Sequence, residues 1–151
     1  MRINRILRKE FFITLFIKQN KWHRYSVLIH TLALVYHAIR AKQYKMIAAG
    51  LLHDIGKPIV AYQDEKDKLT GEYSFTNHEE ISYQLIKKLP FISDYTKNLV
   101  RYHYLIRGKQ KAKEKGQIGR YNRLKRSSDR LDENFLKDLV LFFKFDDLAK
   151  K

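Results

Sequence analysis

The chain has 151 residues, of which 44% are hydrophobic, and it contains no cysteine and carries a net charge of +15. This length and composition suit one packed domain and exclude a disordered tail, and without cysteine any metal must be held by histidine and carboxylate groups. The positive charge attracts polyanions, so we expect a nucleic acid, a nucleotide or an acidic membrane surface as partner, unless the charge serves solubility alone.

The N-terminal segment has basic residues followed by an apolar run at residues 11–17. The run is too short to cross a bilayer, which needs about 20 apolar residues, and no small-residue cleavage site follows it. We therefore expect an amphipathic helix over residues 1–20, with a peripheral membrane contact as the alternative. We expect no transmembrane segment and a cytoplasmic location, which suits a chain without cysteine.

Apolar residues recur at helical spacing through most of the remaining chain. The segments with this spacing are residues 3–18, 24–41, 44–54, 77–89, 94–107 and 133–149. Asn77 with Glu80 predicts a capping box, and Ser93 predicts an N-cap for the next helix. Residues 59–76 are expected to form a loop. The sequence predicts an all-α bundle of about six helices, with residues 1–151 as a single domain.

The composition changes between residues 107 and 131, where lysine and arginine dominate and core residues are scarce. Such a stretch is typical of a solvated segment. We expect an exposed basic loop at about residues 107–131.

The adjacent pair His53 and Asp54 ends an apolar segment just before Gly56. An imidazole beside a carboxylate is a poor end for a core helix and a good pair of ligands for a divalent metal. Four further candidate ligands follow one order along the chain, as His30 before the pair and His78, His103 and Asp146 after it. A single histidine on an apolar face is more often a hydrogen-bonded core residue, so the prediction depends on this joint order.

The sequence resembles the HD superfamily of metal-dependent phosphohydrolases, which fold as all-α bundles. The minimal H…HD…D signature is matched by His30, His53, Asp54 and Asp146, and the two-metal variants have extra histidines that His78 and His103 match. The local likeness lies in the segments 50–57 (GLLHDIGK), 77–82 (NHEEIS), 100–103 (VRYH) and 144–149 (KFDDLA). Asp147 is the alternative to Asp146 as the last ligand, because the closing segment has two aspartates.

This resemblance implies one or two divalent metal ions, which could be manganese, iron, nickel, cobalt or magnesium. It implies that His30, His53, Asp54 and Asp146 hold one ion and that Asp54 bridges to a second ion held by His78 and His103. Such a pair of ions activates water for in-line attack on phosphorus. We expect Asp54 and Lys57 to be catalytic, with Lys57 contacting a phosphate oxygen. Alternatively, Lys57 is a solvated lysine at the end of the helix. Arg107 and Arg120 are expected to bind substrate with Lys57.

Three functions remain open from the sequence. The first is hydrolysis of a nucleotide phosphoester, which could be a phosphomonoester, a cyclic phosphate or a dinucleotide. The second is a metal-dependent nuclease acting on single-stranded DNA or RNA, which suits the basic segment. The third is a non-catalytic nucleic-acid-binding or regulatory module. No protein partner can be inferred.

Overall fold

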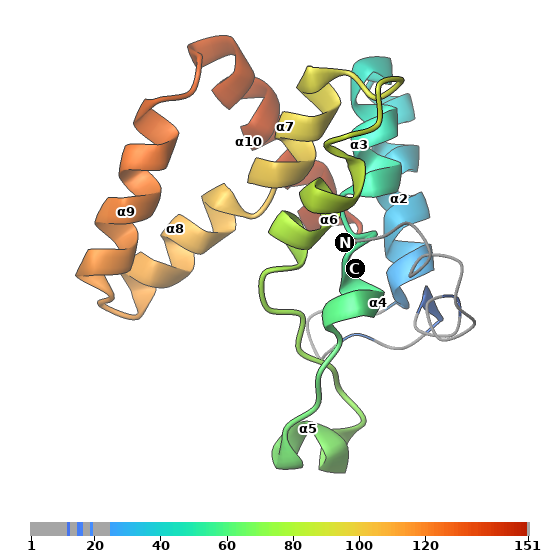
Figure 1. Ribbon diagram of the computed structural model, residues 1–151, viewed down its shortest axis with the longest axis vertical. Helices are drawn as coiled ribbons and strands as arrows, with labels where there is room; N and C mark the ends of the chain where they lie inside the picture. The colour runs from blue at the N-terminus through green and yellow to red at the C-terminus, as the bar shows by residue number, and fades with distance from the viewer. Residues whose placement is uncertain (1–11, 13–14, 17–18, 20–24, 151) are drawn as a thin grey trace.

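The structure is a computed structural model, and it describes residues 12, 15, 16, 19 and 25–150. The helix expected over residues 1–20 lies almost wholly outside these residues. Within residues 25–150 the chain forms nine α-helices, and the β structure there is limited to isolated bridges (Figure 1). The predicted all-α fold is confirmed. No helix in the described part of the chain has the length and apolar character needed to cross a membrane.

The helices are shorter and more numerous than the six expected. Their bounds are α2 (Val27–Arg40), a 3-10 helix η2 (Tyr44–Met46), α3 (Ile47–Leu52), α4 (Lys57–Val60), α5 (Glu65–Thr70), α6 (His78–Ile86), α7 (Asp94–Tyr102), α8 (Leu105–Glu114), α9 (Ile118–Asp129) and α10 (Glu133–Leu148). The expected helices 44–54 and 94–107 both end early, and each ends immediately before a histidine of the predicted metal site.

One of the two predicted helix caps is formed. The Ser93 side chain accepts a hydrogen bond from the backbone N–H of Thr96 at 3.2 Å, which confirms the predicted N-cap of α7. The capping box at Asn77 is wrong, because Asn77 has a positive φ of 61° and its side chain makes no capping bond. The Glu80 carboxylate instead accepts a hydrogen bond from Gln84 within α6.

The core is formed by apolar side chains from α2, α3, α6, α7 and α10, and these helices pack closely around it. Its buried members are Leu34, Ala38, Met46, Ala49, Leu85, Ile86, Leu99, Val100, Phe142, Phe145 and Ala149. His30 lies on the same face of α2 as Leu34 and Ala38, since residues three or four apart share one side of a helix. The core therefore positions the face of α2 that carries the first predicted ligand.

The basic segment 107–131 is helical, so the expected loop is wrong. It forms α8 and α9, which pack against each other as a hairpin and turn at Gly116, where φ is 63° (Figure 1). Small residues made the packed face hard to recognise, because after Leu105 at the start of α8 its buried positions are Gly108 and Ala112. Leu124 faces Gly108 from α9. Lysine, arginine and glutamine are also good helix formers when such a face exists.

Candidate metal centre

Buried histidine side chains from four parts of the fold meet beside the core. They are His30 within α2, His53 directly after α3, His78 at the start of α6 and His103 directly after α7. Asp54 follows His53, and Asp146 lies in the last turn of α10. The structure thus brings together all six predicted ligands from segments that are far apart in the sequence.

A backbone carbonyl fixes one ring nitrogen of each histidine. The Nδ1 atoms of His53, His78 and His103 donate to the carbonyl three residues earlier, at 2.7, 2.8 and 2.7 Å respectively. Nδ1 of His30 donates to the carbonyl of Ala149 at 3.2 Å. Because a carbonyl only accepts, Nδ1 of each ring carries a proton, and a ring that is neutral then has its Nε2 lone pair available for a metal.

The local fold explains this anchoring at two of the four rings. His53 and His103 are the C-terminal caps of α3 and α7, and the last carbonyls of a helix lack N–H partners within the helix. Each ring takes one of these carbonyls as its acceptor. The helix ends therefore orient the two histidines that follow them, in the manner usual for metal-binding imidazoles.

The Nε2 atoms face one another across short distances. The Nε2 atoms of His30 and His53 are 3.4 Å apart, and those of His78 and His103 are 3.1 Å apart. Two lone pairs at such distances repel each other unless positive charge lies between them. Imidazole nitrogens and carboxylate oxygens are ligands that suit several divalent metals, so the side chains present fit such an ion.

The ligand atoms form two groups that share Asp54. The first group is His30, His53 and Asp54, and the second is Asp54, His78 and His103; within each, the ligand atoms lie within 4.8 Å of one another. Oδ2 of Asp54 is 3.1 Å from Nε2 of His53, whereas Oδ1 is 3.4 Å from Nε2 of His78. One carboxylate thus faces both groups, as a ligand that bridges two metals must.

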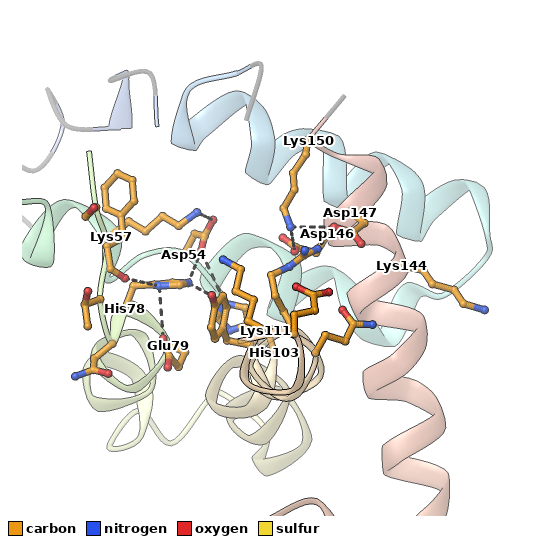
Figure 2. A pocket seen from close by; sticks show the side chains of 18 of the residues that line it. Asp54, Lys57, His78, Glu79, His103, Lys111, Lys144, Asp146, Asp147 and Lys150 are labelled. Atoms are coloured by element: carbon orange, nitrogen blue, oxygen red, sulfur yellow. Dashed lines mark hydrogen bonds and ion pairs between the residues drawn. The ribbon is translucent and has the colours of Figure 1, made fainter. Parts of the chain in front are cut away.

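The structure distinguishes between the two aspartates near the C-terminus. Oδ1 of Asp146 lies 3.0 Å from Nε2 of His30 and 3.8 Å from Nε2 of His53, so it belongs with the first group. Asp147 instead forms an ion pair with Arg107 and lies 3.0 Å from Nζ of Lys150 (Figure 2). Asp146 is therefore the aspartate placed to complete the first group.

The electrostatics of the centre favour neutral rings at His78 and His103 and ionised carboxylates at Asp54 and Asp146. Burial lowers the pKa of His78 to about 4 and that of His103 to about 3. Burial acts to raise the pKa of Asp54, but the neighbouring His53 and Lys57 outweigh it and hold the pKa well below its ordinary value. The pKa of Asp146 is also well below its ordinary value, since its bond to the His30 ring outweighs burial. Deprotonated ligands are what a metal requires.

His53 is the histidine on which positive charge is most strongly favoured. Burial acts to lower its pKa, but the carboxylate of Asp54, aided by Asp146, outweighs burial and raises the pKa. The carboxylates of Asp54 and Asp146 thus attract positive charge to His53, a member of the first group.

Lys57 is buried and does not extend into solvent. Its Nζ lies 2.6 Å from Oδ2 of Asp54 and donates a hydrogen bond of 2.5 Å to the side chain of Gln19. Lys57 is only 5% exposed, so the alternative of a solvated lysine at a helix end is wrong. Figure 2 shows its side chain reaching towards Asp54.

A cavity of about 1240 Å³ opens beside the centre. Asp54, Lys57, His78, His103 and Asp146 lie in its wall, and so do several charged residues of α8 and α9. Pockets for small ligands have volumes of about 300–1000 Å³, so this cavity has room for more than a small phosphoester.

Both arginines predicted to bind substrate line this cavity. The guanidinium of Arg107 is held by Asp147 and lies 4.8 Å from the centroid of the Phe143 ring. Arg120 is exposed on α9. Its guanidinium donates a hydrogen bond of 3.4 Å to the side chain of Gln117, and no ion pair of Arg120 is found among the described residues. Of the two, Arg120 has the guanidinium that is available to a ligand.

Two residues at the centre were not identified from the sequence. Lys150 lies 2.8 Å from Oδ2 of Asp146 and so holds the carboxylate from the side away from His30. Its position four residues after Asp146 on a helix is a signal that could have identified it. Gln19 is fully buried and bonded to Lys57, but nothing in the surrounding sequence indicates this contact.

Comparison with known proteins agrees with this geometry. The family model described as HD domain matches residues 27–134, while no curated protein matches the chain. The match covers more than half of the chain and includes the segments of His30, His53, Asp54, His78 and His103, whereas Asp146 lies outside it. HD domains bind divalent metals and are typically metal-dependent hydrolases. The chain therefore belongs to the HD domain family.

Proposed function

We propose that this protein is a metal-dependent phosphohydrolase that cleaves phosphoester bonds of nucleotides. The observation that carries the proposal is the pair of ligand groups that share Asp54, with Asp54, His78, His103 and Asp146 in the wall of one cavity. In this proposal Asp54 bridges, His30, His53 and Asp146 complete one group, and His78 and His103 complete the other.

Divalent metals bound by these groups would supply a low-pKa water and would neutralise charge on phosphate oxygens. The protein side chains position these partners. The carbonyl bonds at Nδ1 hold the imidazoles with their Nε2 atoms towards the centre, and Lys150 fixes the carboxylate of Asp146. Lys57 places an ammonium group beside Asp54 at the wall of the cavity, where it can donate to a phosphate oxygen of the substrate.

A nucleotide suits the chemistry of the cavity wall. Cationic side chains lie in the wall for the phosphate, and Phe75 and Tyr104 offer aromatic faces for a base. The Tyr104 ring lies edge-on to the His78 ring, with centroids 5.8 Å apart, so a base stacked there would sit close to the centre.

Hydrolysis by metal-stripped protein resupplied with manganese, nickel or magnesium tests the proposal. The substrates are nucleoside monophosphates, 2′,3′-cyclic AMP and bis(p-nitrophenyl) phosphate. We expect Asp54→Asn to reduce metal-dependent turnover by about 100-fold or more, because the variant loses a ligand of both groups and the metals supply several kcal/mol to the transition state.

Asp138→Asn is the matched control. Asp138 is an ion-paired aspartate bonded to Lys45 and Tyr95, away from the ligand groups. It should keep full turnover when assayed at a temperature where the variant remains folded. Metal-independent turnover, or turnover that survives Asp54→Asn, would refute the proposal.

A further inference from the structure

The α8–α9 hairpin, here called the basic hairpin and defined as residues 105–130, carries more than half of the net charge of the protein. It contains ten lysines and arginines and two acidic residues, so its charge is +8 of the +15 of the whole chain. It extends away from the other helices (Figure 1). Residues 105–130 are about one sixth of the chain, so this charge is strongly concentrated.

Most cations of the basic hairpin form no ion pair with an acidic group among the described residues; Arg107, which pairs with Asp147, is the exception. The exposed cations of α9 and its C-terminal cap are Arg120, Arg123, Lys125, Arg126 and Arg130. Like charges held this close repel one another, and a bound polyanion relieves that repulsion.

The basic hairpin is continuous with the catalytic cavity. Lys111 and Lys115 of the first half and Arg120 of the second line the cavity that also contains Asp54 and His103. The other exposed cations of α9 follow Arg120 along the helix, which runs back towards α10 (Figure 1). A chain of phosphates lying along α9 would thus reach the wall of the cavity at Arg120.

The geometry favours a single strand over a duplex or a membrane. Asp54 and His103 are only 2% and 5% exposed, so a phosphodiester must enter the recess singly, which a rigid duplex cannot allow. A helix that binds membranes needs a broad apolar face. On α9, Tyr121 and Leu124 are half-buried, and Ile118 is the large apolar residue left exposed.

We propose that the basic hairpin binds the phosphate backbone of single-stranded nucleic acid and directs one phosphodiester into the cavity. The cleavage step rests on the proposed function, whereas strand binding does not. A helix of 12 residues is about 18 Å long, so a strand lying along it places several phosphates beside its cations. The preferred substrate is then a strand of several nucleotides.

Binding is measured by fluorescence anisotropy with labelled single-stranded oligonucleotides of 2, 5, 10 and 20 nucleotides, in the presence of EDTA so that no cleavage occurs. We expect affinity to rise steeply with length while the strand is shorter than α9 and only slowly beyond that length. For a single strand the log–log salt slope changes by about 0.7 for each phosphate contact, which is about fivefold in affinity per contact between 0.1 and 1 M salt.

A hairpin variant changes Lys113, Arg123, Lys125 and Arg126 to glutamine, which keeps helix propensity. We expect it to bind the 20-nucleotide strand about 100-fold or more weakly at 0.1 M salt and to have a salt slope smaller by about 3. The matched control changes Lys66, Lys68, Lys87 and Lys88 to glutamine, which removes the same charge from exposed positions outside the hairpin. The control should bind the strand nearly as the wild type does, and circular dichroism verifies that both variants are folded.

The outcomes separate the two proposals. Strand binding that the hairpin variant loses, without metal-dependent turnover of any ester, would refute the proposed function and leave this inference standing. Metal-dependent turnover of bis(p-nitrophenyl) phosphate without strand binding would refute the inference alone, as would equal losses in the hairpin and control variants. Binding of the wild type to vesicles of phosphatidylserine and phosphatidylcholine, without binding to any oligonucleotide, would assign the hairpin to an acidic membrane and overturn the inference. If the hairpin variant does not fold, the salt slope and length dependence of wild-type binding test the inference. Binding that is independent of salt and of strand length would refute it.

Discussion

Gly56→Ala tests whether the close contact between the His-Asp segment and α6 positions the second ligand group. A Cβ atom added to Gly56 would lie 2.6 Å from the carbonyl oxygen of His78 and 2.7 Å from the backbone nitrogen of Ser82. The native glycine N–H also donates to the Ser82 hydroxyl at 2.9 Å. The contacts are with the backbone of α6, so rotation of a side chain cannot relieve most of them.

The size of the effect follows from these distances. The two segments must separate by about 0.4 Å before the closest contact reaches even 3.0 Å, which exceeds the tolerance of about 0.2 Å for a metal–ligand bond. Overpacking of this kind costs about 1–3 kcal/mol, and we expect a fall in Tm of about 2–12 °C for a domain of this size. His78 moves with α6, so we also expect metal affinity at the second group to fall about tenfold or more.

The assay combines thermal unfolding with calorimetric titration of metal-free protein by manganese. Gly119→Ala is the matched control, because a Cβ at Gly119 meets no atom within 4 Å and alanine favours a helix by up to about 1 kcal/mol. It should keep or raise the Tm and leave metal binding unchanged. A Gly56→Ala protein with the stability and both metal affinities of the wild type would refute this account of the glycine.

Three further predictions concern the metal centre. Lys150→Gln should weaken manganese binding at the first group about tenfold in a titration, because Asp146 loses the cation that fixes it. Lys137→Gln, which removes an exposed ion pair with Glu133, is the control. Equal manganese affinities of the Lys150 and Lys137 variants would contradict the role of Lys150. The metal-free protein should lose a few kcal/mol of unfolding free energy as the pH falls from about 6.5 to about 4. The reason is that His78 and His103 bind protons in the unfolded chain but, with their lowered pKa values, not in the folded one. The raised pKa of His53 offsets part of this loss. Denaturant unfolding at several pH values measures it, and a flat profile over that range would be inconsistent with these pKa values. Manganese at 100 times its Kd should add about 2.7 kcal/mol to the stability, and an unchanged denaturation midpoint would mean that the folded state binds no metal.

The sequence alone was enough to predict the all-α class and the ligands that the fold brings together. His53 and Asp54 are adjacent, and the segments around His78 and His103 carry recognisable motifs, so the composition of the site could be read before its geometry was known. The sequence favoured Asp146 over Asp147, and the structure gives the physical reason. Neighbouring residues on a helix point about 100° apart, and packing of α10 against α2 decides which carboxylate meets His30.

The main error, the basic hairpin, has a physical cause. Apolar periodicity identifies helices with large core residues, whereas α8 packs through Gly108 and Ala112, and α9 packs mainly against α8. Long-range contacts were also inaccessible from local patterns. The bond between Gln19 and Lys57 joins residues 38 positions apart, and that between His30 and Ala149 joins residues 119 positions apart.

The carbonyl anchors of the four histidines imply an order in which the centre is completed during synthesis. The rings of His53, His78 and His103 are oriented by carbonyls only three residues earlier, so each can be fixed once its own stretch of chain has folded. His30 is synthesised before any of them. Its ring can be oriented only after Ala149 and Asp146 have been synthesised, because these residues bond to its two nitrogens. The earliest ligand to leave the ribosome is therefore the last to be set, and the group that His78 and His103 share with Asp54 can form before the other.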